Sequence, residues 1–222
     1  MTTSITTPEG IVNLALGRIK YPMRIGSIWE GSKAAKEALD IYGQTRDDLL
    51  RTNDWPFARR DAQLVLLNQA PAGGYIPPIT WDPANDPPLP WRFQYEYPSD
   101  CLRIRSIRPV DVFLINYDPR EHRFTVTNDA SGNFNNPNFN NPNFNIGGDG
   151  AKTILTNVGS VAVATYSGRL TDPTTFDADF TEAFAEALAR RLAPVLTDME
   201  AAKVAAQYET KATSEADLTQ AG

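Results

Sequence analysis

Hydrophobic residues recur at helical spacing near the beginning of the chain. Between residues 7 and 20 they fall three or four positions apart, which predicts a helix that Thr7 caps. The range 33–52 repeats this spacing directly after Ser32, another residue type that favours helix N-caps. This part of the chain therefore predicts two amphipathic helices.

A helical pattern returns after Gly168. Thr175 is expected to cap a third helix, and Pro194 is expected to break or kink it because proline has no backbone N–H to donate. Residues 197–200 form a capping-box pattern that predicts a fourth, alanine-rich helix. The apolar residues that step by four along the third helix are Phe176, Phe180, Phe184, Leu188 and Leu192.

The middle of the chain, residues 91–168, alternates apolar and polar positions, which is the period of a β-strand. No helical pattern separates the runs, so an antiparallel sheet is expected rather than a parallel one. A strand is also predicted to lead out of the second helix over residues 58–66. The predicted strands of the middle region are 91–97, 101–107, 111–117, 122–128, 152–158 and 161–167.

These patterns together predict an α+β fold. A small antiparallel bundle of two N-terminal and two C-terminal helices would carry an inserted antiparallel β-sheet with long loops. The expected parts are the first two helices and first strand at 1–67, a proline-rich arm at 68–90, the β insertion at 91–168, and the closing helices and tail at 169–222.

Two segments follow neither period. Prolines crowd between residues 70 and 90, and their density excludes a helix or an interior strand and favours a stiff arm. Within the β insertion, residues 133–145 repeat the unit NFNNP. Exposed apolar patches often mark interaction sites, so this repeat loop is expected to contact a partner protein through Phe134, Phe139 and Phe144.

Charge and cysteine content narrow the possible functions. A net charge of −6 at pH 7 argues against a protein that grips DNA by neutralising its phosphates. Cys101 is the only cysteine and His122 the only histidine, so neither an internal disulfide nor the usual structural zinc site is expected. No run is apolar enough to span a membrane and no signal-peptide pattern opens the chain, so a cytoplasmic protein is expected.

Two kinds of residue could carry chemistry or ligand binding. Trp91, Phe93 and Tyr95 would line a carbohydrate- or ligand-binding face of a β module if they faced solvent. Carboxylates on the predicted helices could serve a carboxylate-based cell-wall hydrolase, although a solvated helix face is the simpler interpretation. These acids are Glu37, Asp40, Asp47, Asp48, Glu182 and Glu186.

Three stretches resemble the head-to-tail adaptor family of tailed bacteriophages, the tail tubular protein A type. The second predicted helix ends in RDDLL and is followed by WPFA, within residues 46–58. The segment YEYPSDCLRI at 95–104 is similar to the family's aromatic strand start. The segment FDADFTEAFAEALARRLA at 176–193 is similar to the family's closing helix. These stretches span most of the chain, whereas the proline-rich arm and the NFNNP repeat depart from the family pattern.

The resemblance implies a structural protein with no enzymatic activity and no cofactor or metal. It implies a ring of roughly twelve copies beneath the portal protein, joining the capsid to the tail and to a downstream tail or nozzle protein. Double-stranded DNA would pass through this ring without sequence-specific binding. The implied location is the head–tail junction of the virion, after assembly in the host cytoplasm.

The resemblance also indicates where contacts should lie. The repeat loop is expected to contact neighbouring tail proteins. The corner Trp55, Pro56 and Phe57 is predicted to be structural, because proline forces the preceding residue out of the helical region and the two rings can pack on the bundle. The residues expected to face the portal are Arg190, Arg191, Lys203 and Tyr208.

Overall fold

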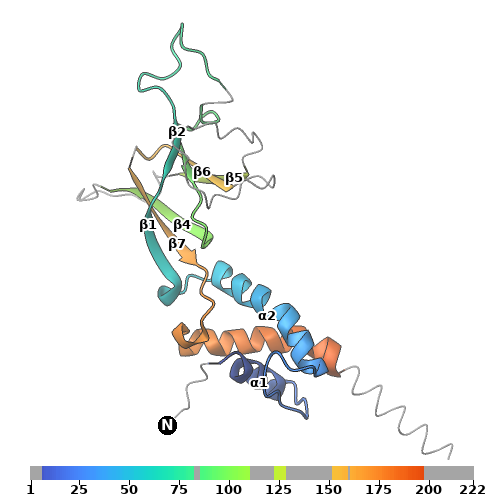
Figure 1. Cartoon of the computed structure of the whole chain (residues 1–222). Helices are drawn as coiled ribbons and strands as arrows, with labels where there is room; N and C mark the ends of the chain where they lie inside the picture. The colour runs from blue at the N-terminus through green and yellow to red at the C-terminus, as the bar shows by residue number, and fades with distance from the viewer. Residues whose placement is uncertain (1–6, 83–85, 111–122, 129–151, 160, 198–222) are drawn as a thin grey trace, which may run out of the picture. The chain divides into compact units, whose positions relative to one another are not determined.

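The chain divides into two compact units, each described by itself. Residues 1–57 and 170–222 form the helical unit, and residues 58–169 form the sheet unit (Figure 1). The computed structural model describes residues 7–82, 86–110, 123–128, 152–159 and 161–197.

The first two helices begin at the residues that the sequence predicts as caps. α1 covers Pro8–Arg18, and the Thr7 hydroxyl oxygen accepts a hydrogen bond from a first-turn N–H at 3.1 Å. α2 covers Lys33–Thr52, and the Ser32 hydroxyl oxygen accepts in the same way at 3.3 Å. Both predicted caps are confirmed, because each satisfies an N–H that has no partner inside its helix.

The third helix covers residues 178–197 and is orange in Figure 1. A short 3-10 helix, η3 at Pro173–Thr175, precedes it. Asp172 caps η3, since its carboxylate accepts a hydrogen bond from a backbone N–H at 2.9 Å. Thr175 therefore lies inside η3 and does not cap the third helix, which corrects the prediction.

Pro194 lies inside helix 178–197, so of the predicted break or kink the break is wrong, and the kink stays a prediction. Proline removes one backbone hydrogen bond from a helix. Leu192 and Leu196, on either side of it, are almost fully buried, and their packing keeps the helical path despite the lost bond. The capping box at 197–200 and the predicted fourth helix lie outside the described residues, apart from Thr197.

The apolar stripe of helix 178–197 fills the core of the helical unit. The predicted four-residue steps are confirmed from Phe180 onward, whereas Phe176 is only half-buried. Tyr42 of α2 packs edge-on against Phe184, with ring centroids 4.8 Å apart. The buried residues include Ile11, Val12, Ala15, Leu16, Ala35, Ala38, Leu50, Phe180, Phe184, Leu188 and Leu192.

The sheet unit contains two antiparallel sheets, where the sequence predicted one. The first has the strand order β1-β7-β4 and the second has the order β2-β3-β6-β5. Every described strand pair is antiparallel, as predicted. The strands are β1 Arg59–Gln63, β2 Leu66–Gln69, β3 Phe93–Glu96, β4 Cys101–Pro109, β5 Phe124–Asn128, β6 Lys152–Thr156 and β7 Ala162–Gly168.

The chain changes sheets between β1 and β2, where the sequence predicted a single strand over residues 58–66. The Leu64 N–H donates to the Ala162 carbonyl oxygen at 2.8 Å, beside the first sheet. The next carbonyl, of Val65, accepts from the Glu96 N–H at 2.9 Å in the second sheet. Alternation of apolar residues continues across this point because both sheets contribute to the same core, so the pattern carries no signal of the change.

One hydrophobic core serves the sheet unit. Tyr95 of β3 is fully buried, and its hydroxyl donates to the Val158 carbonyl oxygen at 3.3 Å, which gives the buried hydroxyl a partner. Residues of the first sheet and of the second sheet both belong to this core. It comprises Leu64, Tyr95, Cys101, Ile104, Ile107, Ile154, Val158, Ala162, Ala164 and Tyr166.

The proline-rich arm connects β2 to β3 and extends beyond β2 in Figure 1. Its base is closed where the Ala70 N–H donates to the Arg92 carbonyl oxygen at 2.7 Å. The Arg92 N–H in turn donates to Oδ1 of Asn157 at 2.9 Å. Farther out, the indole N–H of Trp81 donates to the Pro87 carbonyl oxygen at 3.0 Å. The described part of the arm is thus held by hydrogen bonds within the arm and, at its base, by one to Asn157.

The α+β class is confirmed, but the finer prediction needs correction. The described residues contain three α-helices and two sheets, not a four-helix bundle with one inserted sheet. The strand predicted at 111–117 lies outside the described ranges. Among the helices of those ranges, none combines the length and the apolar content that crossing a membrane requires.

Candidate functional site

The corner at Trp55, Pro56 and Phe57 packs on helix 178–197. The Trp55 ring meets Phe180 nearly at a right angle, with centroids 5.2 Å apart. The Phe57 ring lies 5.2 Å from the same phenylalanine. The Trp55 and Phe57 rings, both half-buried, therefore extend the aromatic core of the helical unit, whereas Pro56 is exposed.

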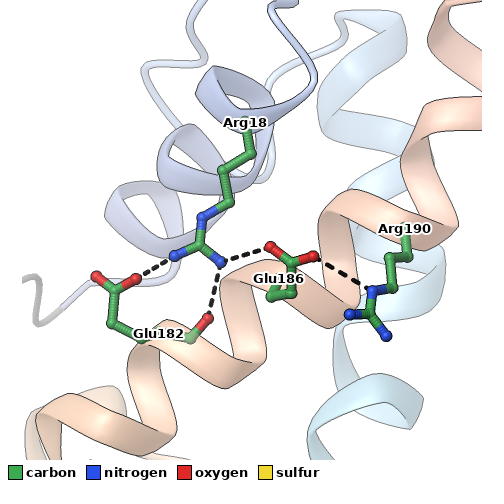
Figure 2. Close-up of polar contacts among 4 residues, drawn as sticks. All are labelled: Arg18, Glu182, Glu186 and Arg190. Carbon is green, nitrogen blue, oxygen red and sulfur yellow. Dashed lines mark hydrogen bonds and ion pairs between the residues drawn. The ribbon is translucent and has the colours of Figure 1, made fainter.

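Figure 2 shows how Arg18 of α1 contacts two acids of helix 178–197. Its Nη1 donates to the Glu182 carbonyl oxygen at 3.0 Å and to Oε2 of Glu186 at 3.1 Å. Its Nη2 donates to the Glu182 carboxylate. Glu186 also accepts from Nε of Arg190 at 3.2 Å. These groups are partly exposed, so each ion pair contributes at most about 1 kcal/mol, and their role is to set the position of α1.

Arg191 joins helix 178–197 to α2. Its Nη1 donates to Oγ1 of Thr45 at 3.0 Å, and its Nη2 donates to Oδ2 of Asp48 at 2.8 Å. Thr45 is itself buried, so the guanidinium supplies a partner to a hydroxyl that water cannot reach. Arg191 therefore performs a structural role inside the helical unit.

The residues predicted to face the portal thus differ in position. The Arg190 side chain is 77% exposed and holds one ion pair to Glu186 in its own helix. Arg191 is engaged with α2, as described above. Lys203 and Tyr208 lie outside the described residues. The phenylalanines predicted to contact tail proteins also lie outside them, namely Phe134, Phe139 and Phe144.

Asp100 connects three strands of the first sheet. Its Oδ1 accepts from the Tyr166 hydroxyl at 3.0 Å, and its Oδ2 accepts from Nη1 of Arg60. Its backbone oxygen accepts from the Arg169 N–H at 2.7 Å. Burial, with Asp100 close by, raises the pKa of Tyr166 to about 12. A Cβ at Gly168 would lie 2.7 Å from Cδ of Arg60, so glycine is needed there for the arginine to reach Asp100.

The aromatic residues considered for carbohydrate binding do not form an exposed row. Tyr95 is fully buried in the core, and Trp91 and Phe93 are half-buried. Phe93 and Tyr95 have ring centroids 6.3 Å apart and stack on each other. The exposed face that this alternative requires is therefore absent at these three positions.

The carboxylates considered for catalysis are mostly engaged in ion pairs. Oδ1 of Asp47 accepts from Arg46 at 2.7 Å, and Asp48 pairs with Arg191. Glu182 and Glu186 bind Arg18. Among the described residues, no group of three or more histidines, cysteines, aspartates or glutamates could hold a metal ion.

The segment between α1 and α2, residues 19–32, is called the Trp29 loop and is fixed to α1. Nδ2 of Asn13 donates to the Ile25 carbonyl oxygen, and its Oδ1 accepts from the Ile25 N–H, both at 2.9 Å. The Ile28 N–H donates to Oε1 of Glu9 at 3.3 Å. Ile25 and Ile28 are buried, so side-chain packing and hydrogen bonds together hold this loop in one conformation.

On this fixed loop, the largest apolar side chain points into solvent. Trp29 is 76% exposed, and Met23 is 57% exposed. The backbone beside Trp29 is held as well, because Oε2 of Glu30 accepts from the Gly26 N–H at 2.8 Å. Tryptophan held rigidly at a surface is typical of the residues that dominate binding energy at protein interfaces.

The proline-rich arm exposes apolar side chains too. An exposed apolar patch on an ordered loop usually marks an interaction site, because solvent contact with such side chains is unfavourable. The arm and the Trp29 loop are the two places where the described residues concentrate exposed large apolar groups. Those of the arm are Ile76, Ile79, Trp81 and Leu89.

Sequence reasoning missed Trp29 and did not single out Asp100. Asp100 lies in the YPSD motif that carries the resemblance, so the signal for it was present. Trp29 follows no hydrophobic period, and only its position in a glycine- and serine-containing segment between two helices set it apart. Exposure at such a position depends on tertiary packing.

No protein-family model matches the chain, and no curated protein matches it either. The functional conclusion therefore depends on the motifs of the sequence and on the surfaces described above.

Proposed function

We propose that this protein is a structural adaptor of a tailed bacteriophage. Copies of the chain form a ring beneath the portal, join the capsid to the tail and let DNA pass during ejection. The proposal includes no catalytic step. Its partners are the portal protein, neighbouring copies of the chain and a downstream tail protein.

The observation that carries the proposal is the pair of exposed apolar surfaces on ordered loops. The Trp29 loop and the proline-rich arm are both held by hydrogen bonds, yet Trp29 is 76% exposed and Ile76 is 64% exposed. A protein that works alone gains nothing from fixing large apolar groups in water. A subunit that assembles with copies and partners buries such groups on assembly.

The residues that carry the resemblance support the proposal through their structural roles. Trp55 and Phe57 of the WPFA stretch pack on Phe180, which belongs to the closing-helix stretch. Asp100 of the YPSD stretch binds Arg60 and Tyr166. Residues that resemble the family pattern and also stabilise the fold support a shared architecture. Such residues are stronger support than resembling residues scattered over the surface.

The charge of the chain is compatible with DNA passing through. The chain has a net charge of −6, which is compatible with an acidic wall around the channel of the ring. An acidic wall would repel the phosphates of DNA, so the DNA would slide through without being held. A clearly basic channel in an assembled ring would contradict this part of the proposal.

The decisive experiment mixes the purified full-length chain with portal assemblies and images the product by electron microscopy. The expected result is a ring on the tail-side end of the portal. An unrelated acidic protein of similar size serves as the control. Failure to bind any portal or tail component would overturn the proposal.

A further inference from the structure

We propose that Trp29 of one copy of this chain inserts into an apolar pocket at the base of the proline-rich arm of a second copy. This inference rests on the proposed ring, for which it supplies the contact between neighbouring subunits. The two surfaces lie on different units of the chain, and each is formed within its own unit.

The receiving site, called the arm-base pocket, has a volume of about 330 Å³. This volume lies at the lower end of the range of roughly 300–1,000 Å³ that is typical of pockets that hold ligands. Its wall is mostly apolar, and two glycines, Gly73 and Gly74, leave room beside the backbone. The lining includes Gly73, Tyr75, Leu89, Pro90, Trp91 and Arg92.

The pocket offers the groups that a tryptophan side chain uses. Leu89, which is 59% exposed, and Trp91 provide apolar surface for the faces of an indole ring. The guanidinium of Arg92 can lie over an aromatic ring, as its Cζ already does at 6.0 Å from the Phe93 centroid. An indole is therefore a better occupant than an aliphatic side chain.

The pocket lining also includes one tyrosine hydroxyl, that of Tyr75. The Tyr75 hydroxyl is buried and has no hydrogen-bond partner among the described residues. A buried hydroxyl without a partner is unfavourable. The indole N–H is a donor with no acceptor function, so a small movement of Tyr75 on binding would satisfy both groups.

Charge complementarity favours a second copy as the occupant. The Trp29 loop carries Lys20 and Arg24 against Glu30, which is net positive. The arm carries Asp82 and Asp86 against Arg92, which is net negative. Although the chain as a whole is acidic, these two segments carry opposite net charge, which favours contact between the Trp29 loop of one copy and the arm of another.

The contact is of the head-to-tail type. The donor surface and the receiving surface are different, so each copy that donates its Trp29 still offers an empty arm-base pocket. Contacts of this type propagate from copy to copy and close into a ring when the rotation between copies allows it. A symmetric dimer would instead use one surface twice and could not grow.

Sedimentation velocity of the full-length chain, at rising concentrations up to about 1 mM, tests the contact. Wild-type chain is expected to associate, and Trp29→Ala is expected to weaken association at least about 30-fold, as for a central interface tryptophan. Val161→Ala, which trims another exposed apolar residue outside both surfaces, should associate like wild type. Equal association of Trp29→Ala and wild type would overturn the inference.

A second variant blocks the pocket without disturbing the fold. Gly73 lines the pocket, and a Cβ there meets no atom within 4 Å, so Gly73→Leu adds an apolar side chain to the pocket wall without a backbone clash. Alone, Gly73→Leu and Trp29→Ala should each associate at least about 30-fold more weakly than wild type, so each is monomeric at concentrations where wild type associates. Mixed, they should form a one-to-one dimer, because the first retains Trp29 and the second retains an open pocket. A mixture that stays monomeric, or wild-type chain that never associates, would overturn the inference.

Failure of this inference can be distinguished from failure of the adaptor proposal. Both variants are also added to portal assemblies and imaged. Rings that form on the portal equally well with Trp29→Ala leave the adaptor standing and exclude the Trp29 contact. If no protein binds the portal, the adaptor proposal fails regardless of the sedimentation result.

Discussion

The indole Nε1 of Trp55 donates a hydrogen bond to the Leu49 carbonyl oxygen at 3.1 Å. Leu49 lies in the last turn of α2, and its carbonyl oxygen also accepts a hydrogen bond from the C-cap N–H of Asn53 at 3.2 Å. The Trp55 side chain thus adds a second hydrogen bond at the end of one helix while its ring packs on Phe180 of another. This single residue connects a helix end to the aromatic core.

Replacing Trp55 with alanine is therefore expected to destabilise the protein by about 2–4 kcal/mol, because a half-buried ring and a hydrogen bond are both lost. Urea unfolding of the full-length chain measures this change. Trp55→Phe keeps a ring but removes the N–H, so it should lose only about 1 kcal/mol. Equal stability of the alanine variant and wild type would contradict the structural role of the corner.

Arg190 and Arg191 are adjacent but should respond differently to truncation. Arg191→Ala removes the contacts to Thr45 and Asp48 and is expected to lower the free energy of unfolding by about 1 kcal/mol. Arg190→Ala is expected to change it by less than about 0.5 kcal/mol, because that side chain is largely exposed. Thermal melting of both variants checks the difference. Comparable destabilisation by the two would count against the described contacts.

Asp100→Ala should destabilise the sheet unit by about 2 kcal/mol, because the Tyr166 hydroxyl loses its acceptor and Arg60 loses its ion pair. Adding Tyr166→Phe in that background removes the stranded hydroxyl and should restore part of the loss. A double-mutant cycle measured by urea unfolding separates the two contributions. Strictly additive effects of the two substitutions would show that no coupling exists between these side chains.

Stability is expected to fall at alkaline pH. Burial raises the pKa of the Cys101 thiol from 9.0 to about 11 and the pKa of Tyr166 from 10.0 to about 12. Each group stays neutral in the folded state at pH values where it is already ionised in the unfolded chain. The contribution of each group to the free energy of unfolding is complete below the pKa that the group has in the unfolded chain. This contribution is lost as pH rises through the pKa of the folded state, and it amounts to up to about 1.4 kcal/mol for each unit by which the two pKa values differ.

The free energy of unfolding should therefore decrease between about pH 9 and pH 12, as measured by urea titrations at each pH. Cys101→Ala should flatten the part between about pH 9 and pH 11, with the tyrosine part unchanged. A stability profile that is flat over the whole range would contradict the burial of both groups.

The sequence by itself determined the local elements. Thr7 and Ser32 marked the starts of α1 and α2, because their hydroxyl groups cap helices through contacts a few residues away. The four-residue spacing from Phe180 to Leu192 identified the buried face of helix 178–197. The alternation of apolar and polar residues located β3, β4 and β7. The helical spacing and the strand alternation could both be recognised because each depends only on residues close together in the sequence.

Tertiary structure decided everything that requires distant residues to meet. The separation of β1 from β2 depends on whether Leu64 and Val65 bond to β7 or to β3, which no local pattern encodes. The path of the helix through Pro194 depends on the burial of the leucines around it. The structural role of Arg191 and the exposure of Trp29 also follow from packing between segments, because only the folded chain determines which side chains find partners and which remain in solvent.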